Sequence, residues 1–376
     1  MKKIVLVLVS VLLCQTIFAQ RAAVVNQDKK FGFIKEDGSW LIKPTYKSAI
    51  SFSDGLAGVF DGDNWGFVDS SGEMVIEAKY DKVKGFNSGL AVVALGKKWM
   101  YINKKGEEVS LQISDKVFDF HDGVAFFRQD GLVGLMNPKG EVLADAKYKK
   151  ILKFKNGHAK VLLGESWGLV DNKGKEVIEA IYQEVGYMSQ GIAKVKKDDV
   201  YGLVIDGTFT KVDGAIKIWG FTDGENLTYA LNADKKVGFI DRSGKWVIQP
   251  AYKKAKRFSN GLAPVMGGKL WGYIDESGNM VIAEQYKDAE TFSNDGLAPV
   301  KIKKAWGFID RSGKLVIEDE YAISAMSFNF FKGQTKGFEN GLSRVGYKKK
   351  WGFINTKGEV LNGTWYINAE NFVEIE

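Results

Sequence analysis

Short alternations of large apolar and small or polar residues recur along almost the whole chain. In the copy at residues 306–317, Trp-Gly-Phe-Ile alternates as a strand does, a polar Asp-Arg-Ser-Gly link follows, and Leu-Val-Ile starts another apolar run. A run of the Gly-Leu-Ala-x-Val type, such as residues 261–265, precedes most Trp-Gly pairs, and its Leu lies nine residues before the Trp. This pattern predicts three short strands in each copy.

The copies recur at a nearly fixed period. The slot of the Trp-Gly glycine returns at a spacing of about 34 residues, with one longer step before the last copy, and such a period is typical of repeat architectures. The ten slots hold Gly32, Gly66, Met100, Gly134, Gly168, Gly202, Gly238, Gly272, Gly307 and Gly352.

The period predicts an all-β tandem array of about ten three-stranded modules, open and curved into a superhelix. The array is expected over residues 20–361, with residues 362–376 as a C-terminal cap. A closed propeller-like ring is the alternative. We favour the open array because the period is short for a four-stranded blade and because ten blades exceed the usual four to eight.

A polar link joins the second and third strands of each module. A glycine stands six residues after the Trp-Gly glycine in nine of the ten modules, as in Gly313, and suits a hairpin residue with positive φ. The link begins with Asp in five modules, at Asp69, Asp171, Asp241, Asp275 and Asp310. We interpret these carboxylates as turn formers that bond back to the loop backbone.

The segment between modules carries two aromatic positions. A Tyr is followed six residues later by Phe or Met, as in Tyr80 and Phe86. We expect a turn or short helix between them, and we expect both side chains to fill the space between neighbouring modules. The ninth module departs from this spacing through an insertion within 322–336 that contains Met326, Phe328, Phe330 and Phe331. This insertion either packs on its own repeat or contacts a ligand or partner.

The full motif resembles the bacterial WG-containing repeat. Trp-Gly-Phe-Ile-Asp-x-x-Gly-Lys-x-Val-Ile, then Tyr, then Phe-Ser-x-Gly-Leu-Ala-x-Val, is similar to that repeat over residues 22–361. The resemblance implies a β-rich tandem repeat, often found on exported or envelope proteins, with no catalytic residue set to transfer.

The N-terminus predicts export. Lys2 and Lys3 precede an apolar run and a short segment that ends at Ala19, so residues 1–19 are expected to be a signal peptide. Cys14 is the only cysteine, and its removal with the signal leaves none for disulfides. No other run is long enough to span a bilayer. We expect the mature chain to be secreted, periplasmic or on the cell surface, and not transmembrane.

Candidate chemistry is sparse. The two histidines, His121 and His158, occupy different repeat slots, and no nucleotide-binding loop or nucleophile motif is present. We therefore predict no enzymatic activity, no cofactor and no metal. A hydrolase that uses carboxylates such as Asp206 and Asp223 is the weakest alternative.

Lysine pairs precede the Trp-Gly slot in several modules and give the main functional hypotheses. They stand at 29–30, 97–98, 196–197, 235–236, 303–304 and 348–350, at the tips of the expected first hairpins. They either keep open edges from pairing or form a positive rail along the array. Loss of Lys2 and Lys3 with the signal peptide lowers the net charge from +7 to about +5, which is too mild to indicate nucleic acid.

We predict a scaffold for protein–protein interaction, with a binder of glycans or anionic polymers as the alternative. The partner is therefore a protein or a polysaccharide. The candidate ligand-binding residues are Lys303, Lys304, Lys348, Lys349, Lys350, Trp219, Phe328, Phe330 and Phe331.

Overall fold

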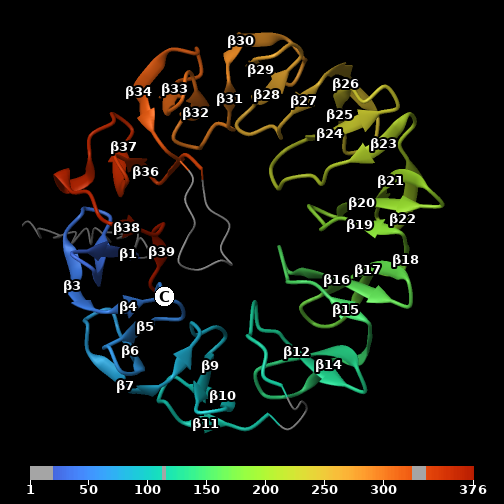
Figure 1. Cartoon of the computed structure of the whole chain (residues 1–376). Helices are drawn as coiled ribbons and strands as arrows, with labels where there is room; N and C mark the ends of the chain where they lie inside the picture. Colours follow the sequence, from blue (N-terminus) through green and yellow to red (C-terminus); the bar gives the residue numbers. More distant parts are fainter. Residues whose placement is uncertain (1–19, 112–115, 324–335) are drawn as a thin grey trace, which may run out of the picture.

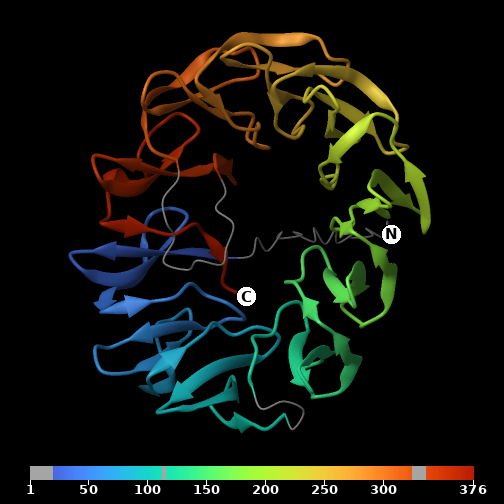
Figure 2. The ribbon, with the colours of Figure 1, turned by 45° about the vertical axis from the view of Figure 1, so that its right-hand side comes forward.

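The chain forms a closed ring of small antiparallel sheets (Figure 1). The computed structural model describes residues 20–111, 116–323 and 336–376, and ten sheets are formed within these ranges. A view turned by 45° shows the same circular arrangement, so the sheets stand as blades around one axis (Figure 2). The open superhelical array that we expected is therefore wrong, and the alternative, a propeller-like ring, is the observed fold.

Most blades have four strands rather than the predicted three. In the ninth blade the fourth strand is β31 (Asp288–Ala289), which pairs antiparallel with β32 (Ala298–Lys301). This innermost strand comes from the segment between the repeat Tyr and Phe, for which we expected a turn or short helix. Two residues are too few to show the alternation of a strand in the sequence. Strands of this length also explain how a four-stranded blade fits into so short a repeat.

The strand bounds follow the chain from blade to blade. The first four blades, from the inner strand outward, are β38 (Asn368–Ala369) and β39 (Val373–Glu374) with β1 (Arg21–Gln27), β2 (Lys30–Lys35) and β3 (Trp40–Tyr46); β4 (Ser48–Ala49), β5 (Ala57–Phe60), β6 (Trp65–Val68) and β7 (Met74–Tyr80); β8 (Lys82–Val83), β9 (Leu90–Leu95), β10 (Lys98–Asn103) and β11 (Glu108–Val109); and β12 (Ala125–Gln129), β13 (Leu132–Met136) and β14 (Val142–Tyr148).

The next three blades are β15 (Lys150–Ile151), β16 (His158–Leu163), β17 (Ser166–Asp171) and β18 (Glu176–Tyr182); β19 (Glu184–Val185), β20 (Ile192–Lys197), β21 (Val200–Ile205) and β22 (Thr208–Lys211); and β23 (Ala215–Ile218), β24 (Leu227–Asn232), β25 (Val237–Asp241) and β26 (Trp246–Tyr252). The last three are β27 (Lys254–Ala255), β28 (Ala263–Met266), β29 (Trp271–Ile274) and β30 (Met280–Tyr286); β31 and β32 with β33 (Trp306–Ile309) and β34 (Leu315–Tyr321); and β35 (Phe338–Glu339), β36 (Leu342–Tyr347) and β37 (Lys350–Asn355), followed by the 3-10 helix η1 (Leu361–Gly363).

The two ends of the chain close the ring by sharing the first blade. Strand β38 pairs with β1 through Val25 and Ala369, and β39 pairs with β1 through Ala22 and Val373. The segment that we expected to be a C-terminal cap therefore supplies the inner strands of the first blade.

The glycine of the Trp-Gly pair lies beneath a bulge of the outer strand. In the ninth blade, Trp306 pairs with Tyr321 and Phe308 with Ile317, so three residues of β34 pass the single residue Gly307. A Cβ atom on Gly307 would lie 2.6 Å from the carbonyl oxygen of Ile317, so the position has room only for glycine.

The third blade shows the converse case. Met100 occupies the glycine slot there, and the outer strand β11 is only two residues long and pairs with Tyr101 and Ile102 alone. The outer strand therefore does not pass over the substituted position.

Aromatic pairs join consecutive blades. The ring of Phe308 in the ninth blade lies 5.0 Å from that of Phe338 in the tenth, and Phe33 lies 4.9 Å from Phe52 across the first seam. Most of the repeat tyrosines are buried as well, with Tyr148 fully inaccessible. The prediction that both aromatic positions fill the space between modules is confirmed.

The polar links form the predicted turns. The Asp310 Oδ1 atom accepts hydrogen bonds from the Ser312 backbone N–H at 2.9 Å, the Ser312 hydroxyl at 2.6 Å and the Lys314 N–H at 3.1 Å, while Gly313 has a φ of 85°. The bonds to Ser312 and Lys314 hold the pKa of Asp310 below its usual value. The carboxylates of these links are turn formers, as the sequence indicated.

Several expectations lie outside the described residues. These are the signal peptide at 1–19 with Cys14, and Met326, Phe328, Phe330 and Phe331 of the insertion. Among the residues that the structure does describe, no helix is long and apolar enough to cross a membrane.

Candidate binding face

The ring presents different loops on its two faces. One face, called the tip face, carries the hairpins between the second and third strands of each blade and the links from each outer strand to the next inner strand. The other, called the turn face, carries the Asp-x-Ser-Gly turns and the turns that precede each second strand. Every lysine pair from the sequence analysis lies in or beside a hairpin of the tip face.

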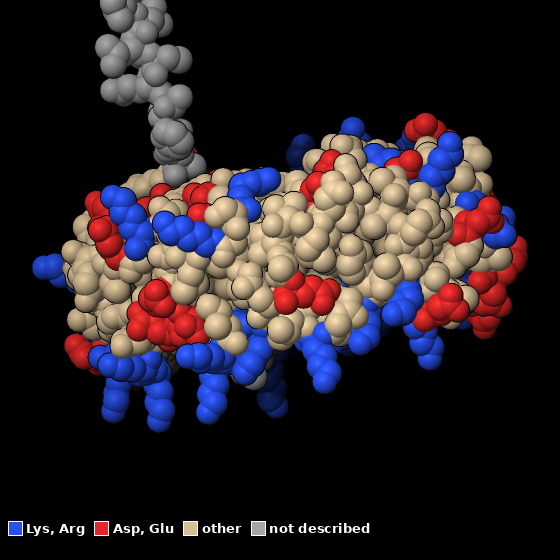
Figure 3. Space-filling view, turned by 90° about the horizontal axis from the view of Figure 1, so that it is seen from above, with Lys and Arg blue, Asp and Glu red and all other residues tan. Residues whose placement is uncertain are grey.

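Cationic side chains project from one side of the ring. In Figure 3, which looks along the plane of the ring, a row of Lys and Arg side chains extends from one face, whereas the visible part of the opposite face is mixed in charge. The exposed lysines of the tip hairpins in the described ranges include Lys29, Lys30, Lys97, Lys98, Lys235, Lys303, Lys304, Lys348, Lys349 and Lys350. The expectation that the tips gather lysines along one edge thus takes the form of a face of the ring.

The tip of the tenth blade has an unusual backbone for lysine. Lys348 and Lys349 have φ values of 45° and 65°, and they connect β36 to β37 as a two-residue hairpin. Turns with positive φ at both central residues strongly prefer Asn-Gly or Asp-Gly, because other side chains are strained there. Two lysines therefore occupy positions where a less strained pair would serve the fold better.

The tip lysines differ in whether a carboxylate neutralises them. Lys98 pairs with Glu108 at 2.7 Å, and Lys196 pairs with Asp199 at 2.6 Å. Within the described ranges, no ion pair involves the lysines Lys303, Lys304, Lys349 and Lys350. The uncompensated charge of the tip face thus includes the ninth and tenth blades, where all five of the predicted ligand lysines lie.

A groove of about 420 Å³ separates the tips of these two blades. We call it the tip groove, and its lining consists of Lys301, Lys304, Ala305, Trp306, Glu320, Tyr321, Ala322, Ile323, Gly346, Lys348, Lys349, Lys350 and Trp351. The structure brings together Lys304, Lys348, Lys349 and Lys350 from the predicted set. Lys303 is exposed in the same β32–β33 hairpin but is not part of the lining.

Aromatic side chains support the groove from below. The ring of Tyr321 lies 6.0 Å from Tyr347 and 6.4 Å from Trp365, and Tyr347 lies 5.4 Å from Trp365. Burial, with a further contribution from the neighbouring Glu320, raises the pKa of Tyr321 to about 12. The sequence analysis did not assign these residues to a site, because Tyr321 is the ordinary repeat tyrosine and Trp365 lies in the segment expected to be a cap.

Trp219 lies elsewhere in the ring. It follows β23 in the seventh blade, is half-buried, and stacks on Tyr229 with ring centroids 4.5 Å apart. The Lys217 ammonium lies 4.8 Å from the Trp219 ring. The eighth blade stands between Trp219 and the hairpins of the tip groove, so the structure does not bring this candidate to the lysines.

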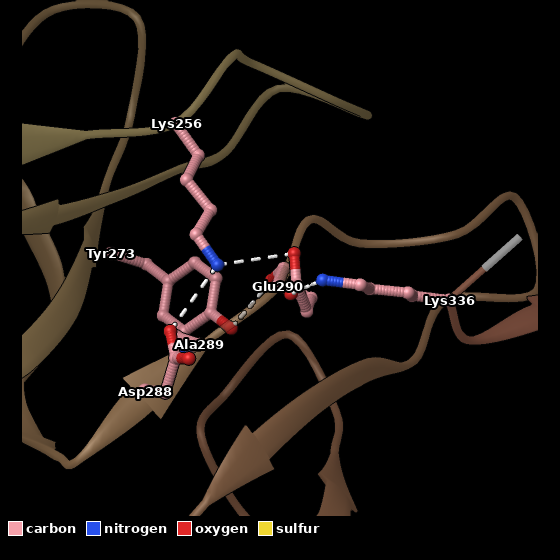
Figure 4. A network of polar contacts seen from close by, with 6 residues as sticks. All are labelled: Lys256, Tyr273, Asp288, Ala289, Glu290 and Lys336. Atoms are coloured by element: carbon pink, nitrogen blue, oxygen red, sulfur yellow. Dashed lines mark hydrogen bonds and ion pairs between the residues drawn. The ribbon is translucent and has the colours of Figure 1, made fainter. Parts of the chain in front are cut away.

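The residues that flank the insertion are anchored on either side of it. Ile323 is buried in the lining of the tip groove, and Lys336 donates to Glu290 of the ninth blade at 2.7 Å. Figure 4 shows Glu290 between Lys336 and Lys256, which also bridges to Asp288. No pattern in the sequence marks this network, because its members belong to three separate modules.

The turn face carries a depression of comparable size but opposite charge. It has a volume of about 430 Å³, and its lining includes Asp54, Glu339, Glu374 and Glu376. Arg21 lies in the same lining and pairs with both Glu36 and Glu339 at 2.9 Å. The two faces of the ring therefore differ in the charge that they offer a partner.

The histidines do not converge on a site. His121 lies in the turn that enters the fourth blade, and burial, together with the nearby Lys153, lowers its pKa. His158 begins β16 and its Nδ1 atom lies 2.7 Å from the carbonyl oxygen of Asn156. Across the described part of the chain, no three His, Asp or Glu side chains are grouped so that they could hold a metal ion.

Comparison with known families finds one repeat over most of the chain. The model of the WG containing repeat matches residues 31–65, 65–99, 99–132, 134–165, 167–201, 238–269, 271–304 and 306–321. The gap at 202–237 runs from β21 of the sixth blade to the first residue of β25 in the seventh. No curated relative matches the sequence.

Comparison with solved structures supports the ring. A structure described as the eukaryotic initiation factor is 9% identical, with a TM-score of 0.51, and the match covers 94% of this chain and 98% of that one. At this identity the likeness shows the fold alone. The computationally designed Ika8 protein (14% identity, TM-score 0.34, 70% and 93% covered) and the extracellular domain of BT4673 from B. thetaiotaomicron (9%, 0.30, 90% and 58%) are more distant.

Proposed function

Because the chain belongs to the WG-containing repeat family and its repeats close into a ring, we propose that it is an exported, non-enzymatic scaffold that docks onto an anionic macromolecule through its tip face. The observation that carries this proposal is the row of Lys and Arg side chains on one face (Figure 3). Complementary charge accelerates encounter and orients the partner, and a rigid ring presents many such charges at once.

The lysine positions support binding rather than a purely solvating role. Lys348 and Lys349 occupy left-handed positions that strain the hairpin, and strain of this kind is concentrated at functional sites. The lysine pairs stand in hairpins whose two strands pair with each other, as β1 does with β2 and β32 with β33, and not along the outer strands, where the open edges lie.

The non-enzymatic part of the proposal rests on the recurrent carboxylates. The link residues, such as Asp69 and Asp310, accept backbone N–H groups in turns. Asp223, one of the two carboxylates considered for a hydrolase, accepts hydrogen bonds from Ser189 at 2.6 Å and Asn156 at 2.9 Å. These contacts give each group a structural role in the fold.

An acidic protein surface is the first candidate partner, because a broad face of separated charges matches an extended surface better than a small ligand. An acidic glycan is the second candidate, and the tip groove with its aromatic lining favours it. Export through residues 1–19 is part of the proposal and places the protein where envelope proteins and glycans are available.

The test is binding of residues 20–376 to immobilised poly-L-glutamate at about 0.01 M and about 1 M salt, between which the Debye length falls from about 30 Å to about 3 Å. We expect tight binding at low salt that is lost at high salt. Absence of binding at low salt, or binding that salt does not change, contradicts docking through the lysines.

A further inference from the structure

We propose that the tip groove binds a segment of an acidic polysaccharide, with lysines from both rims on its carboxylates and tryptophans against its sugar rings. This inference rests on the proposed function, and it names the class of partner for one part of the tip face. It follows from the donors that line the groove, from the space that small residues open in it, and from the contrast with the other seams.

The polar lining of the groove consists almost entirely of hydrogen-bond donors. Five lysines line it, Lys301 and Lys304 from the ninth blade and Lys348, Lys349 and Lys350 from the tenth, against the single acid Glu320. In the described ranges only Lys348 of these five has a partner, the neighbouring Tyr347. A ligand for this groove must therefore carry negative charge and many acceptor oxygens.

The same groove exposes two tryptophans. Trp306 and Trp351 are half-buried in its lining, and within the described residues neither indole N–H has a hydrogen-bond acceptor. Arg344 covers one side of Trp351, with its guanidinium carbon 4.3 Å from the ring centroid. Indoles of this kind offer an apolar surface with a donor at its edge, which suits the C–H faces and hydroxyl oxygens of a sugar.

Small residues keep the floor of the groove open. In the ninth blade, the backbones of Lys301 and Asp288 are opposite each other in the β-ladder between β32 and β31. The corresponding backbone partners in the tenth blade are Gly346 and Ala322. A Cβ atom on Gly346 would lie 3.0 Å from the Trp351 ring, so glycine is what allows the indole to lie across the strand.

Three other tryptophan seams lack this combination. The Trp271 ring is buried beneath Lys256, which is itself paired with Asp288 and Glu290. Trp99 is exposed, but the adjacent Lys98 is neutralised by Glu108. Trp65 lies beside a hairpin tip, residues 61–64, that contains two aspartates and no lysine. Free lysines on both rims thus mark the tip groove among these seams.

The groove is suited to an acidic glycan rather than to a globular acidic surface. Its volume lies within the roughly 300–1,000 Å³ of ligand pockets, and its aromatic and cationic groups converge from two hairpins. A uronic acid unit presents a carboxylate, hydroxyl acceptors and a C–H face within one ring, which matches the lysines and the indoles together.

The experiment is titration of residues 20–376 with an oligogalacturonate and with its fully methyl-esterified form, followed by calorimetry and by the NMR signals of the ten tryptophan indole N–H groups. We expect the oligogalacturonate to bind and to shift the indole N–H signals of Trp306 and Trp351. The variants Trp306→Phe and Trp351→Phe identify these two signals, because each variant lacks one of them. The esterified chain should bind about tenfold or more weakly, because its carboxylates no longer carry charge.

A variant pair keeps the test independent of folding. Lys348→Asn with Lys349→Gly places the preferred residues in the left-handed turn, so the hairpin remains while two charges are lost. We expect this variant to bind the acidic chain about tenfold more weakly. The matched control, Lys105→Asn with Lys139→Gly, removes two exposed lysines from Asx turns of the turn face and should leave affinity unchanged.

The outcomes separate this inference from the proposed function. If the oligogalacturonate does not bind, or binds without moving the Trp306 and Trp351 signals, while poly-L-glutamate still binds through the tip lysines, the glycan assignment is wrong and the docking face stands. If neither polymer binds at low salt, both are wrong. If the control variant weakens binding as much as the groove variant, the groove is not the site.

Discussion

The backbone N–H of Ile367 donates to the carbonyl oxygen of Asn26 at 2.8 Å and so joins the last turn of the chain to its first strand. Strand β38 begins at the next residue, and β38 and β39 both pair with β1. The ten blades are closed into a ring by this shared sheet, and the ring fixes the tip hairpins on one face.

Removal of residues 367–376 should open the ring. The deletion takes away β38, β39 and the buried side chains of Ala369, Phe372 and Ile375. The loss of one buried Phe alone costs about 3–5 kcal/mol, so we expect a decrease in unfolding free energy of at least about 3 kcal/mol. Urea denaturation measures the unfolding free energy, and small-angle scattering measures the radius of gyration, which we expect to increase. Removal of Glu376 alone is the control, and an unchanged stability after the longer deletion contradicts this account of closure.

The glycine beneath the outer-strand bulge should not tolerate a methyl group. Gly307→Ala places a Cβ 2.6 Å from the Ile317 carbonyl oxygen, and overpacking of this kind costs about 1–3 kcal/mol. Gly220→Ala is the matched control, because its Cβ would meet no atom within 4 Å and its φ is not in the left-handed region. Urea denaturation compares the two, and equal effects would show that the close approach is not what excludes a side chain.

Because aromatic side chains pack between blades, a substitution that destabilises one blade should also destabilise its neighbour. Phe308→Ala removes a fully buried ring that packs on Phe338, at an expected cost of about 3–5 kcal/mol. Stability in repeat proteins is the sum of units and their interfaces, so hydrogen exchange should accelerate first in the ninth and tenth blades. Uniform acceleration in all blades runs against this expectation.

The link aspartates should give the fold an acid-sensitive component. Hydrogen bonds within their turns lower the pKa of Asp69, Asp275 and Asp310. A carboxyl whose folded pKa lies below its unfolded value of about 3.9 stabilises the fold above that value, and the contribution disappears as the pH falls through the folded pKa.

Replacement of these three residues by Asn, the residue that other copies carry in the same slot at 103, 137 and 355, should flatten the decline of melting temperature below about pH 4. The comparison is of melting curves for parent and variant from neutral to acidic pH. Parallel declines would show that these carboxylates do not cause the acid sensitivity.

The sequence was informative wherever one residue type answers one local constraint. The turn aspartates, the positive-φ glycines and the Tyr and Phe positions that fill the seams all follow from the repeat, and the structure confirms them. The inner strands escaped prediction because two residues, such as Asp288 and Ala289, cannot show a period of two. Ring closure escaped it because the pairing of β1 with β38 joins opposite ends of the chain.

The sequence allowed the lysines of the candidate site to be predicted, but not the other residues of the tip groove. The lysines of the tips could be found because they repeat, and four of those predicted line the tip groove. Tyr321, Gly346 and Trp351 could not be assigned to a site, because each occupies an ordinary repeat slot or a hairpin strand. Only the meeting of the ninth and tenth blades shows that they share a groove with the lysines.

The most direct test of docking through the tip face, rather than through overall charge, measures the affinity of two variants of equal net charge for poly-L-glutamate at low salt. One changes Lys303 and Lys304 to Gln with Lys348→Asn and Lys349→Gly on the tip face. The other changes Lys105, Lys139, Lys173 and Lys357 to Gln on the turn face, where all four are exposed. We predict a loss of affinity of about tenfold or more for the first variant alone. Equal losses in both variants would show that the protein binds through its overall charge and would contradict the assignment of the tip face.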